Sequence, residues 1–296
     1  MANARDIQTR IKSVQDTMKI TNAMYLISST KVKKARRALE QAEPHFYDSE
    51  KLIAEVLRDL PQLQNIYFGN TEEQGYAAEP RKGYLVISGD KGLAGAYNHN
   101  VVKAAEESLK DGGSMELYVV GQLGRSALQK QGFNVQKHFD YAAQNPTVER
   151  ARLITEYLVQ RFREGELTEI NVVYTRMVNA GESVPEVRRL LPLRKETFER
   201  YAAGEPEATA YLPSPEAVMD SIVPNYLTGY VYGALVESFT SEENARMLAM
   251  KSATDSAGDM LRELSVIYNS VRQAAITQQI VEVAGGAKAQ KRKKSS

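Results

Sequence analysis

Both ends of this 296-residue chain carry a long stripe of apolar residues that repeats every 3.5 residues. Alternate steps of four and three residues from Ile7 to Leu60 meet an apolar side chain at thirteen of sixteen positions. The same steps from Val218 to Val281 meet one at fourteen of nineteen. A 3.5-residue period is typical of a coiled-coil seam. The two ends are therefore predicted to form long helices that pair with each other.

The length of these stripes limits how they can pack. Sixty helical residues span about 90 Å at a rise of 1.5 Å per residue. A middle domain of about 130 residues is only about 30–40 Å across. Most of the helix pair should therefore project beyond that domain, as an antiparallel, left-handed coiled coil, because a folded middle returns the chain to its start. The alternative is that each stripe packs on the middle domain separately.

Local signals set the expected limits of the two helices. Pro44 removes a backbone donor and is predicted to kink or break the first helix. Ser214 and Pro215 resemble an N-cap followed by a proline in the first turn. Gly285 and Gly286 are expected to end the second helix.

The middle of the chain alternates between strands and helices, which predicts a mainly parallel sheet with helices on its faces. Strands are expected at 83–88, 115–121, 133–139 (an edge strand), 170–174 and 186–193, and helices at 99–110, 122–131 and 147–164. The predicted fold class is α/β plus a long antiparallel α-helical coiled coil formed by the N- and C-terminal helices. The predicted divisions are an N-terminal coiled-coil helix (1–62), a linker (63–81), an α/β, Rossmann-like foot domain (82–195), a second linker (196–213), a C-terminal coiled-coil helix (214–286) and a basic tail expected to be disordered (287–296).

Composition excludes several classes of protein. The 38 Lys and Arg against 37 Asp and Glu leave a net charge of +1, which argues against a dedicated nucleic-acid binder. The absence of cysteine excludes disulfides, thiolate metal sites and a cysteine nucleophile. No apolar stretch approaches the roughly 18 residues of a transmembrane helix, and the N-terminus has no apolar signal core. A soluble protein on the cytosolic side is the expectation.

The strongest sign of an enzyme is the glycine-rich loop Gly89–Gly95, which lies between a predicted strand and a predicted helix. Its backbone N–H groups could hold a phosphate at a helix N-terminus, but it matches neither common nucleotide-binding motif. A tight turn that needs positive φ is the favoured interpretation. His45, His99 and His138 have no partners at ligand spacing. No catalytic, cofactor-binding or metal-binding residue is predicted.

Charge is unevenly distributed along the predicted helices. Residues 1–40 contain nine basic and three acidic side chains, a net charge of +6 that could follow an acidic partner surface. By contrast, the segment from Val271 to Val281 has Arg272 as its only charge. A solvated helix would normally carry more charges, so this low charge favours enclosure by another protein. The alternative is that the segment packs on its own N-terminal helix.

Four separated blocks resemble the gamma subunit of the rotary proton-translocating ATP synthase. They are residues 11–24 (IKSVQDTMKITNAM), 83–98 (GYLVISGDKGLAGAYN), 245–255 (ARMLAMKSATD) and 268–278 (YNSVRQAAITQ). The resemblance implies a non-catalytic central-stalk rotor shaft, which couples proton flow through the membrane c-ring to ATP synthesis and to the reverse hydrolysis. The implied partners are the alpha and beta subunits of the catalytic ring, the epsilon subunit and the c-ring. The implied location is the cytoplasmic face of a bacterial membrane, as a peripheral protein without a cofactor.

The resemblance also implies which residues contact the ring. Arg272, Gln273 and Thr277 match family positions that contact a beta-subunit loop, and Lys19 and Met24 match the facing N-terminal helix. Where the family often has Lys and Glu, this chain has Asn22 and Gln279, and its Lys/Arg tail after Gln290 extends beyond the usual end. Two other functions stay open from the residues alone: an enzyme that holds a nucleotide at Gly89–Gly95, and a coiled-coil chaperone that grips clients with its tip.

Overall fold

The computed structural model describes residues 4–69, 81–110, 114–179, 181–201 and 209–294. The chain divides into two compact units, one of residues 28–246 and one that joins residues 1–27 to residues 247–296. Each unit therefore contains part of the first helix and part of the last.

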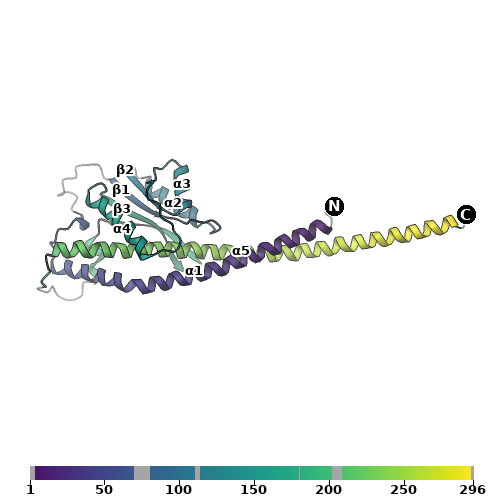
Figure 1. The fold of residues 1–296 in the computed structure, drawn as a ribbon, viewed down its shortest axis with the longest axis horizontal. Coiled ribbons are helices and arrows are strands. Elements are labelled where there is room, and N and C mark those ends of the chain that lie inside the picture. The colour runs from purple at the N-terminus through teal and green to yellow at the C-terminus, as the bar shows by residue number, and fades with distance from the viewer. Residues whose placement is uncertain (1–3, 70–80, 111–113, 180, 202–208, 295–296) are drawn as a thin grey trace. The chain divides into compact units, whose positions relative to one another are not determined.

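Along the chain, one long helix precedes and another follows a region in which strands and helices alternate, as predicted (Figure 1). In chain order the helices and strands are α1 (Ala4–Asp59), β1 (Arg81–Ile87), α2 (Tyr97–Leu109), β2 (Ser114–Val120), α3 (Gln122–Lys130), α4 (Val148–Arg163), β3 (Glu169–Asn179), β4 (Glu182–Leu191) and α5 (Pro215–Lys294). Thr147 caps α4 by accepting a hydrogen bond from the Arg150 N–H, and Ser214 accepts one from the Ala217 N–H before α5. The α/β class with two long terminal helices is confirmed.

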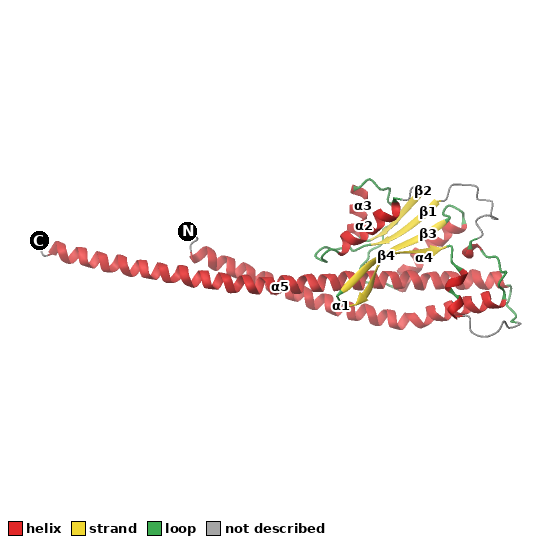
Figure 2. Cartoon of the chain, turned by 180° about the vertical axis from the view of Figure 1, so that it is seen from behind, coloured by secondary structure: helices red, strands yellow, loops and turns green. Residues whose placement is uncertain are grey.

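The four strands form one sheet in the order β2-β1-β3-β4 (Figure 2). The central strand β1 pairs in parallel with β2 and β3, and β4 pairs antiparallel with β3. Side chains alternate between the two faces of the sheet. Leu85 and Ile87 belong to the core cluster that contains α4 and the adjacent parts of α1 and α5, whereas Tyr84 and Val86 belong to the cluster with α2 and α3. The sheet is thus covered by helices on both faces.

Within the 28–246 unit the two long helices contact each other as well as the sheet. The rings of Phe46 and Tyr232 lie 6.3 Å apart, and Lys31 pairs with Glu243 at 2.8 Å. From Lys31 to Phe46 the residue numbers on α1 rise, while those of their contacts on α5 fall from Glu243 to Tyr232, so the two helices run antiparallel. Part of each stripe packs on the middle domain, as the alternative arrangement required, but the paired coiled coil is also present.

The predicted edge strand at 133–139 is wrong. Val135 makes only an isolated bridge to Leu117, because a buried side chain takes the backbone acceptors of this segment. The guanidinium of Arg125, a residue that is 9% exposed, donates hydrogen bonds to the carbonyl oxygens of Gln136 and Phe139 and to that of Val119. The Arg125 side chain therefore satisfies carbonyl groups that would otherwise bond to a neighbouring strand in a sheet.

The break predicted at Pro44 is also wrong, because α1 continues as one helix through this residue. Both Pro44 and Glu40, whose carbonyl loses its usual donor, lie on the exposed side of the helix. Water can satisfy that carbonyl, so no break is required.

The expected helix end at Gly285–Gly286 is wrong, since α5 continues to Lys294. Glycine permits a left-handed helix end but does not impose one, and the alanines and lysines that follow are strong helix formers. The tail at 287–296 is thus helical as far as Lys294, and residues 295–296 lie outside the described residues. Residues 70–80 of the first predicted linker and 202–208 of the second also lie outside them.

Candidate functional site

The unit of residues 1–27 and 247–296 is a helix pair. Its buried seam contains Ile7 on α1 and Met250, Ala257 and Leu264 on α5, each at most 8% exposed. The hydroxyl groups of Thr21 and Thr254 lie 2.7 Å apart across this seam. The apolar stripe predicted from the sequence therefore forms the contact between the two helices up to about Val271.

Beyond Val271 the helix α5 is exposed on every side. Every residue of 272–287, here called the single-helix segment, is exposed, including Ile280 at 63% and Val283 at 74%. Figures 1 and 2 show α5 continuing past the first residues of α1. The expected continuation of the seam through Ala274, Gln278 and Val281 is thus wrong, because no described part of α1 reaches these positions. The alternative in which this segment packs on its own N-terminal helix fails for the same reason.

The single-helix segment combines exposed apolar side chains with very little charge. Its sixteen residues contain only two charged side chains, Arg272 and Glu282. Free helices in water normally carry charged residues around most of their surface. This composition is unusual for a helix that is surrounded by water.

The structure separates the predicted contact residues into two groups. Arg272, Gln273 and Thr277 are exposed at the start of the single-helix segment. Lys19 is exposed and pairs with Asp16 at 3.1 Å, and Met24 is half-buried on α1.

The two groups do not face each other. Thr21 contacts Thr254, which precedes Arg272 by eighteen residues on α5. Eighteen helical residues correspond to about 27 Å along the helix axis. The N-terminal group therefore lies opposite a different part of α5, and the two groups of predicted contact residues lie at different heights along the helix pair.

The side chain of Asp90, a residue of the glycine-rich loop Gly89–Gly95, is hydrogen-bonded to backbone groups elsewhere in the chain. The Asp90 carboxylate accepts hydrogen bonds from the N–H of Gln122 at 3.1 Å and from those of Ala143 and Gln144 at 2.9 and 3.1 Å. Gln122 is the first residue of α3, so the Asp90 carboxylate lies at the N-terminus of α3, whereas the helix that directly follows the loop is α2. The expected positive φ is found at Gly95 (54°). These features fit a structural turn.

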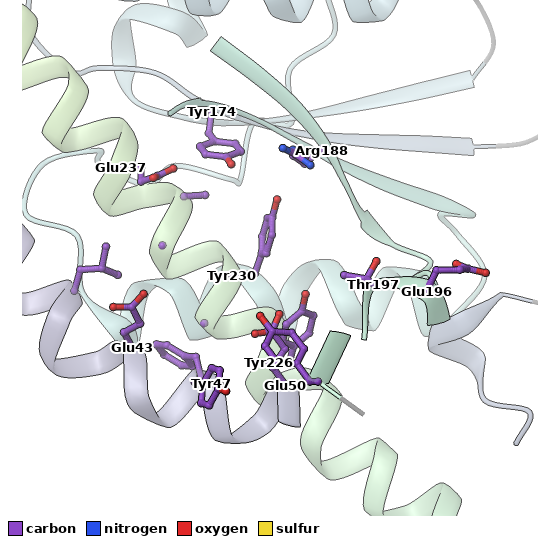
Figure 3. A pocket seen from close by; sticks show the side chains of 16 residues that line it. Glu43, Tyr47, Glu50, Tyr174, Arg188, Glu196, Thr197, Tyr226, Tyr230 and Glu237 are labelled. Atoms are coloured by element: carbon purple, nitrogen blue, oxygen red, sulfur yellow. The ribbon is translucent and has the colours of Figure 1, made fainter. Parts of the chain in front are cut away.

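A cavity of about 770 Å³ lies between α1, α5 and the strands β3 and β4 of the 28–246 unit. Figure 3 shows Glu237 and Tyr230 reaching into it from α5, and Tyr174 and Arg188 from the strands. Burial raises the pKa of the Glu237 carboxyl, and the nearby Arg176 opposes this rise. Arg188 pairs with Glu186 at 2.6 Å. The cavity thus presents phenols, carboxyl groups and one guanidinium.

Across the part of the chain that the structure describes, no three acidic or histidine side chains are grouped closely enough to hold a metal ion. None of the helices over the same residues combines the length and hydropathy that a membrane span requires.

Comparisons with known proteins agree with the fold. A family model described as ATP synthase matches residues 3–290. The ATP synthase gamma chain of Acetivibrio thermocellus is 42% identical over 298 aligned residues, which cover 98% of this chain and 100% of the relative. The ATP synthase gamma chain of Caldanaerobacter subterraneus is 42% identical over 293 residues, covering 96% and 98%.

Solved structures share the architecture at low sequence identity. A chain in the mitochondrial ATP synthase of Euglena gracilis, solved with OSCP, F1 and the c-ring, matches with a TM-score of 0.66 at 16% identity, covering 99% of this chain and 96% of that one. A chain in the central stalk and c-ring of the Tetrahymena thermophila enzyme matches with a TM-score of 0.55 at 21% identity, covering 79% and 99%. The resemblance in the four sequence blocks is confirmed: with a family model and relatives matched over nearly its whole length, this chain belongs to the ATP synthase gamma chain family.

Proposed function

We propose that this chain is the rotor shaft of an ATP synthase. It couples proton flow through a membrane c-ring to ATP synthesis, and to the reverse hydrolysis, in a ring of alpha and beta subunits. The observation that carries this proposal is the single-helix segment, which is apolar, nearly uncharged and exposed on every side. Such a surface is suited to turning inside a protein sleeve, because strong desolvated ion pairs would hold the shaft at fixed angles.

The shaft acts by contacting different catalytic sites with different sides. A ligand or partner shifts an equilibrium between conformations only through a difference in its interaction free energy with them. A helix pair that continues as a single helix is not symmetric about its long axis. At each height along the shaft it therefore presents different side chains to different subunits of a surrounding ring. Each beta subunit would therefore be biased toward an open or a closed state according to the angle of the shaft.

The two groups of predicted contact residues receive separate roles in this proposal. Arg272, Gln273 and Thr277 contact a beta-subunit loop near the end of the shaft. Lys19 and Met24 contact the ring at a lower height, about 27 Å away along α5. Their exposure or half-burial in the helix pair supports these assignments.

The chain itself is proposed to be non-catalytic, with the chemistry in the beta subunits. The Gly89–Gly95 loop supports this assignment, since the Asp90 carboxylate and the carbonyl groups of Lys91 and Gly92 are all engaged by other groups of the chain. The foot domain would bind the epsilon subunit and the c-ring. That contact would hold the chain at the cytoplasmic face of a bacterial membrane as a peripheral subunit, without cofactor or nucleic acid.

Reconstitution tests the proposal directly. The full chain is combined with the remaining subunits in lipid vesicles, and ATP-driven proton uptake is measured with and without the chain. Uptake should depend on the chain, and equilibrium dialysis of the isolated chain should show no stoichiometric ATP binding. Proton uptake that is equal without the chain, or one ATP bound per isolated chain, would contradict the proposal.

A further inference from the structure

Four charged side chains are gathered where α1, α5 and the loop between β1 and α2 meet. We call them the charged quartet: Lys31 on α1, and Glu242, Glu243 and Arg246 on α5. The side chains of both glutamates are 2% exposed, that of Arg246 is 6% exposed and that of Lys31 is 33% exposed. The four formal charges cancel. All four residues belong to the 28–246 unit, and Arg246 is its last residue.

The quartet connects three separate parts of this unit. Glu243 Oε1 lies 2.8 Å from Lys31 Nζ and 3.0 Å from Arg246 Nη1, so it joins α1 to α5. Arg246 Nη2 donates to Glu242 Oε1 at 2.5 Å and to the carbonyl oxygens of Lys91 and Gly92 at 3.1 Å each. Arg246 Nε donates to the Gly92 carbonyl at 3.2 Å. One guanidinium thus binds the second long helix to the loop of the foot domain.

That loop is firmly held on its other side. Asp90 accepts three backbone hydrogen bonds, as described above, and the Gly89 N–H donates to Asn98 Oδ1 at 2.8 Å. The Gly89 carbonyl accepts a hydrogen bond from the Leu123 N–H at 3.1 Å. A force applied at Lys91 and Gly92 would therefore reach α2, α3 and the sheet rather than deform a free loop.

The stability of the fold does not explain this arrangement well. A buried ion network is often no more stable than apolar residues of the same volume. Here Glu242 Oε2 and Glu243 Oε2 are buried without a hydrogen-bond partner, which adds a further cost. Burial by itself would raise the pKa of the Glu243 carboxyl, but the bonds from Lys31 and Ser28 and the charge of Arg246 hold that pKa below its ordinary value. Glu243 is thus retained as a buried charge.

Directional bonds and apolar contacts resist motion differently. The rest of the contact between α5 and the sheet is mainly apolar, with buried residues such as Val231, Leu235 and Phe239. It also includes two hydrogen bonds between uncharged groups at Thr175 of β3, whose N–H donates to Ser238 Oγ at 3.1 Å and whose carbonyl accepts from Ser241 Oγ at 3.3 Å. Apolar burial is non-directional, so it opposes separation of two surfaces more than their sliding. Charge-assisted hydrogen bonds have fixed lengths and angles, and a forked guanidinium fixes several at once.

We propose that the charged quartet is a latch that fastens the foot domain to both long helices, so that turning force passes between the foot and the shaft without slip. This inference rests on the proposed rotor function. Its residues are positioning residues: they contact neither nucleotide nor ring in this account. Without the latch, ATP hydrolysis would still turn the shaft, but less of that motion would reach the foot domain and the c-ring.

The test replaces the whole quartet with apolar residues, which avoids leaving one buried charge unpaired. The variant carries Lys31→Met, Glu242→Leu, Glu243→Leu and Arg246→Met. Assembled in vesicles, it should hydrolyse ATP normally, but the number of protons pumped per ATP should fall below the wild-type value. The matched control replaces an exposed pair on the same helix, Asp259→Leu with Arg262→Met, and should keep the wild-type ratio.

A covalent latch provides the second arm. A Cβ at position 89 would lie 2.8 Å from Glu242 Cδ and 2.9 Å from Asn98 Oδ1, so positions 89 and 242 are neighbours and Asn98 must move to admit a cysteine at 89. Titration of free thiols after oxidation establishes that the disulfide has formed. The chain has no cysteine of its own. In the apolar variant, with Cys in place of Leu at 242 and with Gly89→Cys, oxidation should restore the pumping ratio and reduction should remove it again. The other subunits of the complex are cysteine-free in this experiment.

The outcomes separate the latch from the proposed function. An unchanged ratio in the apolar variant, or equal ratios in the oxidised and reduced cysteine variant, would overturn the latch alone. Assembly of the cysteine variant only after oxidation would show that the quartet merely holds the fold together, and would also overturn it. If the wild-type chain supports no ATP-driven pumping, the rotor function itself fails.

Discussion

Two glycines one turn apart on α5 predict opposite effects of the same substitution. A Cβ at Gly229 would collide with the ring of Phe46 on α1 and would lie 2.6 Å from its Cβ, whereas a Cβ at Gly233 would meet nothing within 4 Å. Gly229 therefore permits the close approach of the two long helices, and Gly233 does not. Gly229→Ala and Gly233→Ala form a matched pair.

The magnitudes follow from two opposing terms. Replacing glycine by alanine inside a helix stabilises by about 0.5–1 kcal/mol. Gly233→Ala should gain about that amount, since its Cβ meets no other atom. For Gly229→Ala the same gain is set against an overpacking cost of about 1–3 kcal/mol, because Phe46 or a helix backbone must move. The net effect at 229 is a loss of up to about 2.5 kcal/mol in the free energy of unfolding.

Urea unfolding of the full-length chain, followed by far-UV circular dichroism, measures both free energies by linear extrapolation. A third variant, Gly229→Ala with Phe46→Leu, isolates the contact, because the smaller side chain leaves room for the added methyl group. In that background the alanine should cost less than in the wild type. If the two single variants shift stability equally in the same direction, the close contact between Gly229 and Phe46 is refuted.

Three further effects are expected. The Glu243 carboxyl has a folded pKa below its ordinary value of 4.5. Its contribution to stability is therefore present above pH 4.5 and is lost as the pH falls through the folded pKa. Glu243→Gln should make stability at acid pH depend less on pH, as measured by the midpoints of urea unfolding. Arg272→Ala with Gln273→Ala should lower the coupling of ATP hydrolysis to proton uptake more than it lowers assembly, and unchanged synthesis and hydrolysis would contradict the assigned contacts. If α1 slides along an acidic surface of a partner, charge reversal at the exposed Lys33 and Lys34 should slow ATP turnover by the assembled complex, to an extent that depends on ionic strength. A turnover rate that is independent of ionic strength would contradict this.

The sequence predicted well what depends on local periodicity. The 3.5-residue stripes gave both long helices and their antiparallel pairing, and short apolar runs gave the strands β1, β2 and β3. These patterns are visible because each residue's burial follows directly from its position on one helix or strand.

Features that depend on distant partners were missed. Glu243 and Arg246 stand out in the sequence only as flaws in an apolar stripe, yet they form the buried network with the Gly89–Gly95 loop. Lys31 was grouped with a basic surface, but the structure pairs it with Glu243. Opposite charges at seam positions of two paired helices are a signal that could have indicated this network.

Three other differences between the predicted and the observed structure also depend on contacts that the local sequence does not show. The segment at 133–139 looks like an edge strand, but the Arg125 side chain, which belongs to another element, takes its carbonyl groups. The glycines at 285 and 286 allow a helix end that nothing in the surrounding structure requires. The exposure of the single-helix segment depends on where its partner helix begins, which no periodicity within α5 can show.

Direct observation of rotation tests the central claim. The exposed Lys103 on α2 is replaced by cysteine, the only one in the chain, and a bead is attached to it while the alpha/beta ring is fixed to a surface. With ATP, the bead should turn in one direction and stop when ATP is exhausted. A stationary bead on complexes that continue to hydrolyse ATP would contradict the account.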